Sequence, residues 1–224
     1  MMSLAILLIL SYLLGAFPSS IVYGRLFRNI DVRKHGSGNA GGTNAWRVLG
    51  WKIGLPVILT DVAKGALASL VIARIPVGEL PLELNVVALL CGVAALLGHV
   101  FPIYTRFKGG KGVATGAGML LVNAPIPVAC ALGVFALTLF LFGKVSLGSI
   151  LAAISLPIFV VCIDRFTSID YPILLLALTI ALALFILYTH RTNVQRLFKG
   201  QEKGFPKLQL WKKFLRPRRQ MPQP

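Results

Sequence analysis

Glycine, hydroxyl and amide residues gather in one short stretch of the sequence, directly ahead of an arginine. The stretch reads Gly36-Ser37-Gly38-Asn39-Ala40-Gly41-Gly42-Thr43-Asn44-Ala45-Trp46-Arg47. Glycines let successive backbone N–H groups converge on an anion, hydroxyls add donors, and a guanidinium adds a charge-assisted, two-pronged contact. The stretch therefore predicts a phosphate-binding loop, and its alternative is a flexible turn. The candidate binding residues are Gly36, Ser37, Gly38, Asn39, Gly41, Thr43, Asn44 and Arg47.

The same glycines satisfy the dinucleotide pattern G-x-G-x-x-G at Gly36, Gly38 and Gly41. That pattern has meaning only after a strand and inside a βαβ unit. Here it lies between two long apolar segments, so a dinucleotide fold is excluded.

A second stretch runs from His99 to Thr115 and contains the turn Gly109-Gly110-Lys111-Gly112. The spacing of a nucleotide P-loop is absent, because Gly112 and not a hydroxyl residue follows Lys111. A Gly-Gly-Lys-Gly turn that opens a helix still offers free N–H groups, a positive dipole end and an ammonium to an anion. The alternative is a pair of orientation-setting lysines on an ordinary turn.

A third set comprises Ser146 to Ser149 and, much later, His190 and Asn193. His190 and Asn193 are three residues apart, which places them on one face of a continuing helix. A lone histidine at a membrane edge is also common as an interfacial residue, so its role stays open.

Asp61 and Lys64 are charges inside an apolar segment, three residues apart. A helix in lipid carries such charges only with partners inside the bundle. Mutual pairing is favoured over direct contact with a substrate.

Metal-assisted chemistry finds little support in the sequence. The chain has only seven Asp and Glu residues, and Cys91, Cys130 and Cys162 stand singly in apolar stretches without metal-ligand spacing. We expect no metal and no cofactor. The phosphate-friendly groups favour binding of a phosphorylated substrate and group transfer over metal-assisted hydrolysis.

The elements that must position these groups are membrane helices. Of the 224 residues, 56% are hydrophobic and only 13% are charged. A helix needs about 20 mostly apolar residues to cross a bilayer, and repeated runs of that kind predict an all-α, polytopic membrane protein. We predict seven transmembrane helices, with the fourth short, at residues 4–26, 53–73, 85–104, 113–122, 126–142, 147–163 and 171–188.

The basic residues predict the orientation of this bundle. Lys and Arg concentrate in the odd-numbered connections and in the tail, and cytoplasmic connections are the ones rich in such residues. The N-terminus is therefore expected outside and the C-terminus in the cytoplasm. The formal charge of +16 is explained in this way, without nucleic acid. A membrane domain over residues 1–203 and a basic cytoplasmic tail over 204–224, in contact with anionic lipid, complete the predicted organisation.

With these motifs in this order, the sequence closely resembles the acyl-phosphate:glycerol-3-phosphate acyltransferase family (PlsY type) of bacterial inner membranes. The resemblance covers nearly the whole chain, through the motifs at residues 11–19, 36–47, 61–65, 99–115, 146–149 and 190–202. It implies transfer of a fatty acyl group from acyl phosphate, not acyl-CoA, to the sn-1 hydroxyl of glycerol 3-phosphate, which gives lysophosphatidic acid and phosphate in the first step of phospholipid synthesis. It also implies a multi-pass protein of the bacterial inner membrane, with its active site facing the cytoplasm. The enzyme that makes acyl phosphate is a further candidate partner.

By the same resemblance, Ser37, Arg47, Lys111, His190 and Asn193 are the expected catalytic residues. The expected substrate-binding residues are Gly36, Gly38, Asn39, Gly41, Thr43, Asn44, Gly109, Gly110, Gly112 and Ser149. Glu202 is expected to be structural.

The chain has no H-x-x-x-x-D motif, because Ala40, Tyr104 and Gln195 stand five residues after its three histidines. Acyl phosphate has a good leaving group, so positioning and charge stabilisation can carry the reaction. The substrate's own phosphate is then the expected proton acceptor, with His190 as the alternative base.

Two other classes of protein remain to be weighed. A carrier for a phosphorylated metabolite would also use broken helices with anion-binding ends, but the outer connections are short and poor in such groups, and no internal repeat is evident. A lipid-binding scaffold would not need three phosphate-type segments.

Overall fold

The structure is a computed structural model that describes residues 2–205, and within that range it contains helices and no strands. Nearly all of the predicted basic tail, 204–224, lies outside the described residues. The α-helices are α1 (Met2–Ala16), α2 (Ser19–Arg28), α3 (Gly42–Leu49), α4 (Trp51–Leu70), α5 (Leu84–Val100), α6 (Val113–Asn123), α7 (Pro125–Phe142), α8 (Val145–Phe166), α9 (Ile173–Thr189) and α10 (Arg191–Phe198). Short 3-10 helices, η1 (Val32–Lys34), η2 (Ile72–Arg74) and η3 (Ile103–Thr105), lie in three of the connections. The all-α prediction is thus confirmed for this part of the chain.

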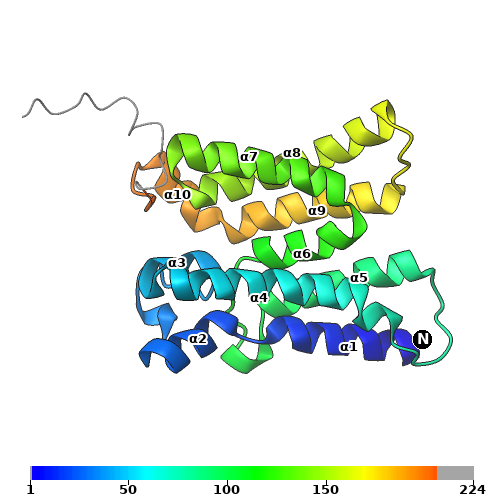
Figure 1. The fold of residues 1–224 in the computed structure, drawn as a ribbon, viewed down its shortest axis with the longest axis horizontal. Helices are drawn as coiled ribbons and strands as arrows, with labels where there is room; N and C mark the ends of the chain where they lie inside the picture. The colour runs from blue at the N-terminus through cyan, green and yellow to red at the C-terminus, as the bar shows by residue number, and fades with distance from the viewer. Residues whose placement is uncertain (1, 206–224) are drawn as a thin grey trace, which may run out of the picture. The chain divides into compact units, whose positions relative to one another are not determined.

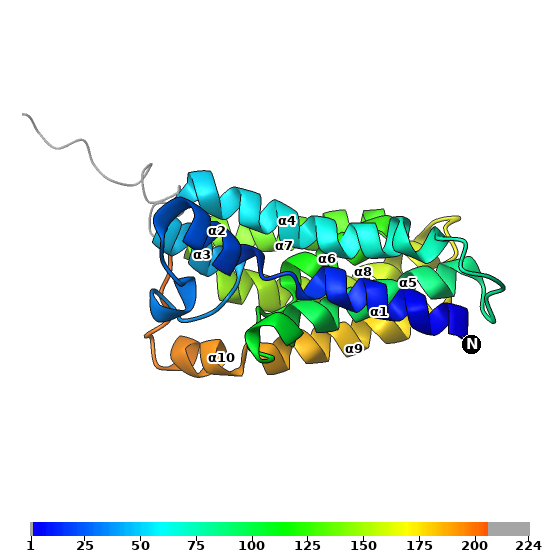
Figure 2. The same cartoon turned by 90° about the horizontal axis from the view of Figure 1, so that it is seen from below.

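The chain divides into two compact units, residues 1–128 and 129–224, and each is described by itself. In the first unit α4 packs against α3, α5 and α6, and α1 packs against α5. Helices α2 and α3 lie at one end of this unit, and the N-terminus lies at the other (Figures 1 and 2).

Small residues allow the helices of the first unit to approach closely. A Cβ at Gly65 would collide with the carbonyl oxygen of Thr115, and a Cβ at Gly118 would collide with that of Val62. These two glycines bring α4 and α6 together. Close backbone approach at glycine is the usual way in which membrane helices gain van der Waals contact, since lipid provides no hydrophobic drive for their association.

Helices α1 and α2 occupy the first predicted span, and the structure breaks that span at Phe17 and Pro18. Proline has no N–H to donate, and it disfavours helical geometry at the residue before it. The first predicted span is therefore built from two helices, although Met2–Arg28 together are long and apolar enough for one span. The break frees the carbonyl oxygen of Phe17, which accepts a hydrogen bond from Lys64.

In the second unit α8 packs against α9, and α10 packs against both. Helices α9 and α10 meet at a bend of 62°, with His190 at the junction. The prediction that the last span simply continues as a helix past His190 was therefore wrong. Asn193 lies on a separate short helix.

The structure has a helix in each of the seven predicted segments. Five stretches are long and apolar enough to cross a membrane, or six if α9 and α10 form one span. Helix α6 has 11 residues, or about 16 Å at 1.5 Å per residue, which is about half of a hydrocarbon core. The count of seven spans and their orientation stay predictions.

Candidate anion-binding site

The first glycine-rich loop is held in shape by Asn44. This side chain is buried in the first turn of α3. Its Oδ1 accepts a hydrogen bond from the Ser37 N–H at 2.8 Å, while its Nδ2 donates to the carbonyl oxygens of Val32 (2.8 Å) and His35 (3.1 Å). Gly36 has a φ of +66°, and a Cβ there would meet the Asn44 amide, so both the conformation and the space require glycine.

These contacts reduce the number of backbone N–H groups that the loop can donate to an anion. The N–H groups of Ser37 and Gly38 already donate within the loop, to Asn44 and to the His35 carbonyl oxygen. Thr43, Asn44 and Arg47 were predicted to lie in the loop. Helix α3 begins at Gly42, so these three residues lie on a helix instead. The Ser37 side chain is exposed and that of Arg47 is half-buried.

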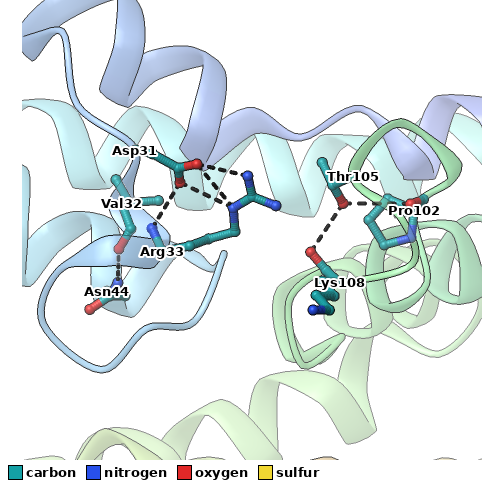
Figure 3. Close-up of polar contacts among 7 residues, drawn as sticks. All are labelled: Asp31, Val32, Arg33, Asn44, Pro102, Thr105 and Lys108. Atoms are coloured by element: carbon teal, nitrogen blue, oxygen red, sulfur yellow. Dashed lines mark hydrogen bonds and ion pairs between the residues drawn. The ribbon is translucent and has the colours of Figure 1, made fainter.

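Asp31 and Arg33 brace the entry to this loop. The Arg33 side chain folds back onto the carboxylate, with Nη2 2.7 Å from Oδ2 and Nε 3.1 Å from Oδ1, and the Arg33 N–H also donates to Oδ1 (Figure 3). The hydrogen bonds from Arg33 hold the pKa of Asp31 at about 2, although burial acts in the opposite direction. The guanidinium of Arg33 is therefore engaged within the protein.

The second turn is seated on the end of α5. The N–H of Gly109 donates to the Val100 carbonyl oxygen at 3.2 Å, and that of Gly110 donates to the His99 carbonyl oxygen at 3.1 Å. These acceptors belong to the last turn of α5, where carbonyl groups lack partners within the helix.

The anion-facing donors of this turn are therefore not those of Gly109 and Gly110. The first N–H that bonds within α6 is that of Gly116, to the Gly112 carbonyl oxygen. The N–H groups of the preceding helix turn, next to Lys111, are those that a helix start presents to an anion. Gly112, at a φ of +87°, lets the chain enter α6 from the turn.

The segment before the turn is strained. Arg106 and Phe107 both have positive φ, at 56° and 60°, a region that costs residues with side chains on the order of 1–3 kcal/mol each. Local bonds hold the segment in place, because the Phe107 N–H donates to the Pro102 carbonyl oxygen and the Thr105 hydroxyl donates to that of Lys108 (Figure 3). Such strain persists only where the surroundings over-determine it.

A buried polar cluster lies beneath the two loops, around Asp61 of α4. Its Oδ1 accepts hydrogen bonds from the Ser19 hydroxyl at 2.6 Å and from Lys64 Nζ at 2.7 Å. The Nδ1 of His99, from α5, lies 3.5 Å from the same oxygen. Asp61, Lys64 and His99 are 1%, 3% and 7% exposed, so they pair with one another, as buried charges must.

Lys64 also donates to the Phe17 carbonyl oxygen at 2.5 Å and lies 3.3 Å from the Ser19 hydroxyl. The ion pair between Lys64 Nζ and Asp61 Oδ1, at 2.7 Å, confirms the predicted pairing of these two residues. The ammonium is directed to three protein oxygens, so its role is in holding α2 and α4 together.

In the second unit, Glu202 gathers three donors. Its Oε1 accepts from the Ser146 hydroxyl at 2.6 Å and from Asn193 Nδ2 at 2.7 Å, and its Oε2 accepts from Arg196 Nε at 3.0 Å. Burial alone would raise the pKa of Glu202, but these hydrogen bonds outweigh it and lower the pKa. The carboxylate joins α8 to α10, as expected for a structural glutamate.

His190 is buried, and its Nδ1 lies 2.9 Å from the Ile186 carbonyl oxygen. A carbonyl oxygen only accepts, so Nδ1 carries the proton in this contact, and in a neutral imidazole the lone pair is then on Nε2. Ser149 is also buried, near the start of α8.

Among residues 2–205 no group of three or more His, Cys, Asp or Glu side chains is placed to hold a metal ion. The donors described above are N–H, hydroxyl and cationic groups, which suit anions and not metals.

The structure thus places Gly36 to Arg47 and Gly109 to Gly112 in the first unit, and Ser149, His190 and Asn193 in the second. Sequence reasoning missed the contact between His99 and Asp61, which are far apart in the chain and meet only when α4 packs against α5. Only one indication of this contact was present in the sequence, which is that both residues lie in segments singled out as candidate motifs.

The chain is similar to known proteins over nearly its whole length. The glycerol-3-phosphate acyltransferase family model matches residues 5–200. Glycerol-3-phosphate acyltransferases of Chlorobium luteolum and Chlorobaculum tepidum are 44% and 42% identical to the chain, and each alignment covers 90% of it and 96% of the relative.

Two crystal structures of PlsY, an integral membrane glycerol 3-phosphate acyltransferase, are also similar, in its glycerol 3-phosphate and lysophosphatidic acid forms. Each has a TM-score of 0.79, at 34% and 33% identity, and covers 93% of this chain and 98% of its own. The chain belongs to the glycerol-3-phosphate acyltransferase family, as a multi-pass integral membrane protein.

Proposed function

We propose that this acyltransferase takes its acyl group from acyl phosphate and transfers it to the sn-1 hydroxyl of glycerol 3-phosphate, releasing lysophosphatidic acid and phosphate. The observation that carries the proposal is the presence of two separate glycine-rich turns in one unit, each with a cation: residues 36–42 precede Arg47, and residues 109–112 contain Lys111. A reaction with a phosphate on both donor and acceptor has a use for two such turns.

The proposed reaction balances without a metal. The hydroxyl oxygen of glycerol 3-phosphate bonds to the acyl carbon, and the bond from that carbon to the phosphate oxygen breaks. The hydroxyl proton passes to the substrate's own phosphate, which is held beside it. Lys111, Arg47 and the N–H groups at the start of α6 stabilise the charge on the leaving phosphate.

His190 is the alternative proton acceptor, and its protonated Nδ1 leaves the lone pair on the nitrogen that a base would use. A positioned general base contributes about 10²–10⁴-fold to rate. A His190→Ala variant that keeps more than about a tenth of wild-type turnover would exclude this alternative. Roles for Ser37, Ser149 and Asn193 in the reaction stay predictions.

We further propose that the protein lies in a bacterial inner membrane with the glycine loops facing the cytoplasm, where soluble glycerol 3-phosphate is available. The basic residues of these connections support this side.

The test is phosphate release by detergent-purified protein that is given palmitoyl phosphate, with and without glycerol 3-phosphate. We expect release that depends on glycerol 3-phosphate, with one lysophosphatidic acid formed per phosphate. Lys111→Met, purified in parallel, controls for contaminating enzymes and should be at least tenfold slower. Release that is independent of glycerol 3-phosphate would show hydrolysis and contradict the proposal; uptake of glycerol 3-phosphate by proteoliposomes without release would favour a carrier.

A further inference from the structure

The side chain of His99 connects the buried cluster around Asp61 to the second glycine turn. The Nδ1 edge of its ring faces the Asp61 carboxylate at 3.5 Å. An ionised carboxylate has no proton to give, so Nδ1 is the protonated nitrogen. The orientation of the ring is therefore set from α4.

The opposite edge of the ring packs against Gly110. The three atoms that a Cβ at Gly110 would meet first are all ring atoms of His99, and Nε2 is the nearest of them. Gly110 is glycine because the imidazole occupies the space of its side chain. The imidazole and the turn are thus in direct contact.

Backbone bonds tie the same two segments together. The carbonyl oxygens of His99 and Val100 accept the N–H groups of Gly110 and Gly109. His99 therefore supports the turn twice, through its carbonyl oxygen and through its ring. The strained residues Arg106 and Phe107 come just before the turn, and a strained backbone keeps its shape only when the surrounding contacts fix it.

We propose that Asp61 and His99 are a positioning pair for catalysis: the carboxylate fixes the imidazole, and the imidazole sets the position of the Gly109–Gly110 turn and hence of Lys111 and the start of α6. The kinetic consequence of this inference rests on the proposed function, but the effect on anion binding does not. A displacement of about 1 Å in a reacting constellation can lower a rate on the order of a hundredfold.

A general-base role does not fit His99, although an imidazole beside a carboxylate is common in catalysis. The ring is 7% exposed, and the nitrogen that would accept a proton lies against the Gly110 backbone.

The main test compares His99→Asn with Ser69→Ala. The asparagine amide nitrogen can replace Nδ1 toward Asp61, but the ring edge beneath Gly110 is lost. Ser69→Ala is the matched control, because the buried Ser69 hydroxyl also links α4 to α5, through the Ala88 carbonyl oxygen at 2.9 Å, at a site without contact to the turn.

Four quantities are measured for each purified variant: the Kd for inorganic phosphate by calorimetry, kcat, KM and the Tm. We expect His99→Asn to weaken phosphate binding at least fivefold and to lower kcat at least tenfold, with KM for glycerol 3-phosphate changed less than threefold. Ser69→Ala should change Kd, kcat and KM less than twofold, even if it lowers the Tm as much as His99→Asn does. Equal effects of the two substitutions on Kd and kcat would overturn the proposal.

A second experiment tests the contact itself by a double-mutant cycle. Gly110→Ala should weaken phosphate binding more than tenfold in the wild-type background, because its methyl group displaces the turn from the imidazole. With His99→Ala the space is open, and the same substitution should cost less than threefold. Additive effects would overturn the proposal. A wild-type protein without acyltransferase activity would contradict the proposed function alone, and this cycle would still decide the positioning role.

Discussion

Asn44 makes three hydrogen bonds to the backbone of its own loop, and its contribution to function follows from that. The residue was predicted to bind substrate, since amides are good phosphate partners. In the structure its amide instead fixes the positions of Val32, His35 and Ser37. The same holds at the second turn, where the N–H groups of Gly109 and Gly110 donate to carbonyl oxygens of α5 and are engaged within the protein.

Asn44→Ala should lower kcat/KM for glycerol 3-phosphate at least tenfold. The substitution removes the partner of one N–H and two carbonyl groups, of which the bond to the Val32 carbonyl oxygen is buried and the other two are partly buried. A buried group that is left unsatisfied costs about 1–3 kcal/mol. Steady-state kinetics on the purified variant measures the effect. Asn123→Ala is the control, because the Asn123 amide donates only to the Met119 carbonyl oxygen of its own helix, and less than a twofold change is expected. Similar losses in both variants would contradict a specific role of Asn44 in shaping the loop.

At the scale of the elements, the ends and breaks of helices position the candidate site residues. The end of α5 accepts the N–H groups of the second turn, and the break between α1 and α2 supplies the carbonyl oxygen that holds Lys64. The start of α6 follows that turn, and the N–H groups of a first helix turn have no partner within their helix. In the second unit, the bend between α9 and α10 places Asn193 on Glu202. In a bundle of straight, unbroken helices these contacts would not form, and the groups that make them would lack these partners.

Glu202 should make the second unit sensitive to acid. Its pKa is lowered in the folded protein, so the carboxylate stabilises the fold above its unfolded pKa, about 4.3, and this contribution is lost as pH falls through the folded pKa. Glu202→Gln should lower the free energy of unfolding at pH 7 by roughly 2 kcal/mol and flatten its decline below about pH 4.5. Thermal unfolding in detergent between pH 7 and pH 4 measures both. The exposed carboxylate of Glu79 gives the control variant, Glu79→Gln, and a Glu202→Gln profile that matches it would refute the role.

At the scale of the whole molecule, the apolar helical segments could be predicted from the sequence. The breaks, the helix starts and the contacts between helices were not predicted. The hydropathy of each segment depends on its own residues, so a helix was found in all seven places. The break at Pro18 had a local signal and was missed, whereas the start of α3 at Gly42 depends on Asn44 reaching back to Val32. The contact of His99 with Asp61 could not be predicted at all, because it requires the packing of α4 on α5. The glycine loops were recognised by composition, but which of their N–H groups are engaged depends on distant acceptors.

The predicted orientation places the two ends of the chain on opposite sides of the membrane, since an odd number of spans is expected. In a background without Cys91, Cys130 and Cys162, single cysteines at the exposed positions Met2 and Gln201 would be probed with a membrane-impermeant maleimide. We expect Met2→Cys to react in intact spheroplasts and Gln201→Cys to react only after permeabilisation. Reaction of both before permeabilisation would mean an even number of spans and would contradict the predicted topology.

The identity of the acyl donor is the central claim, and one competition experiment tests it most directly. The purified enzyme would receive glycerol 3-phosphate with equal amounts of unlabelled palmitoyl phosphate and ¹³C-labelled palmitoyl-CoA, and the mass of the lysophosphatidic acid would be measured. We expect an unlabelled product formed in step with phosphate release. A ¹³C-labelled product would show that the acyl group comes from the CoA thioester, and it would contradict the use of the two glycine-rich turns for a phosphate on each substrate.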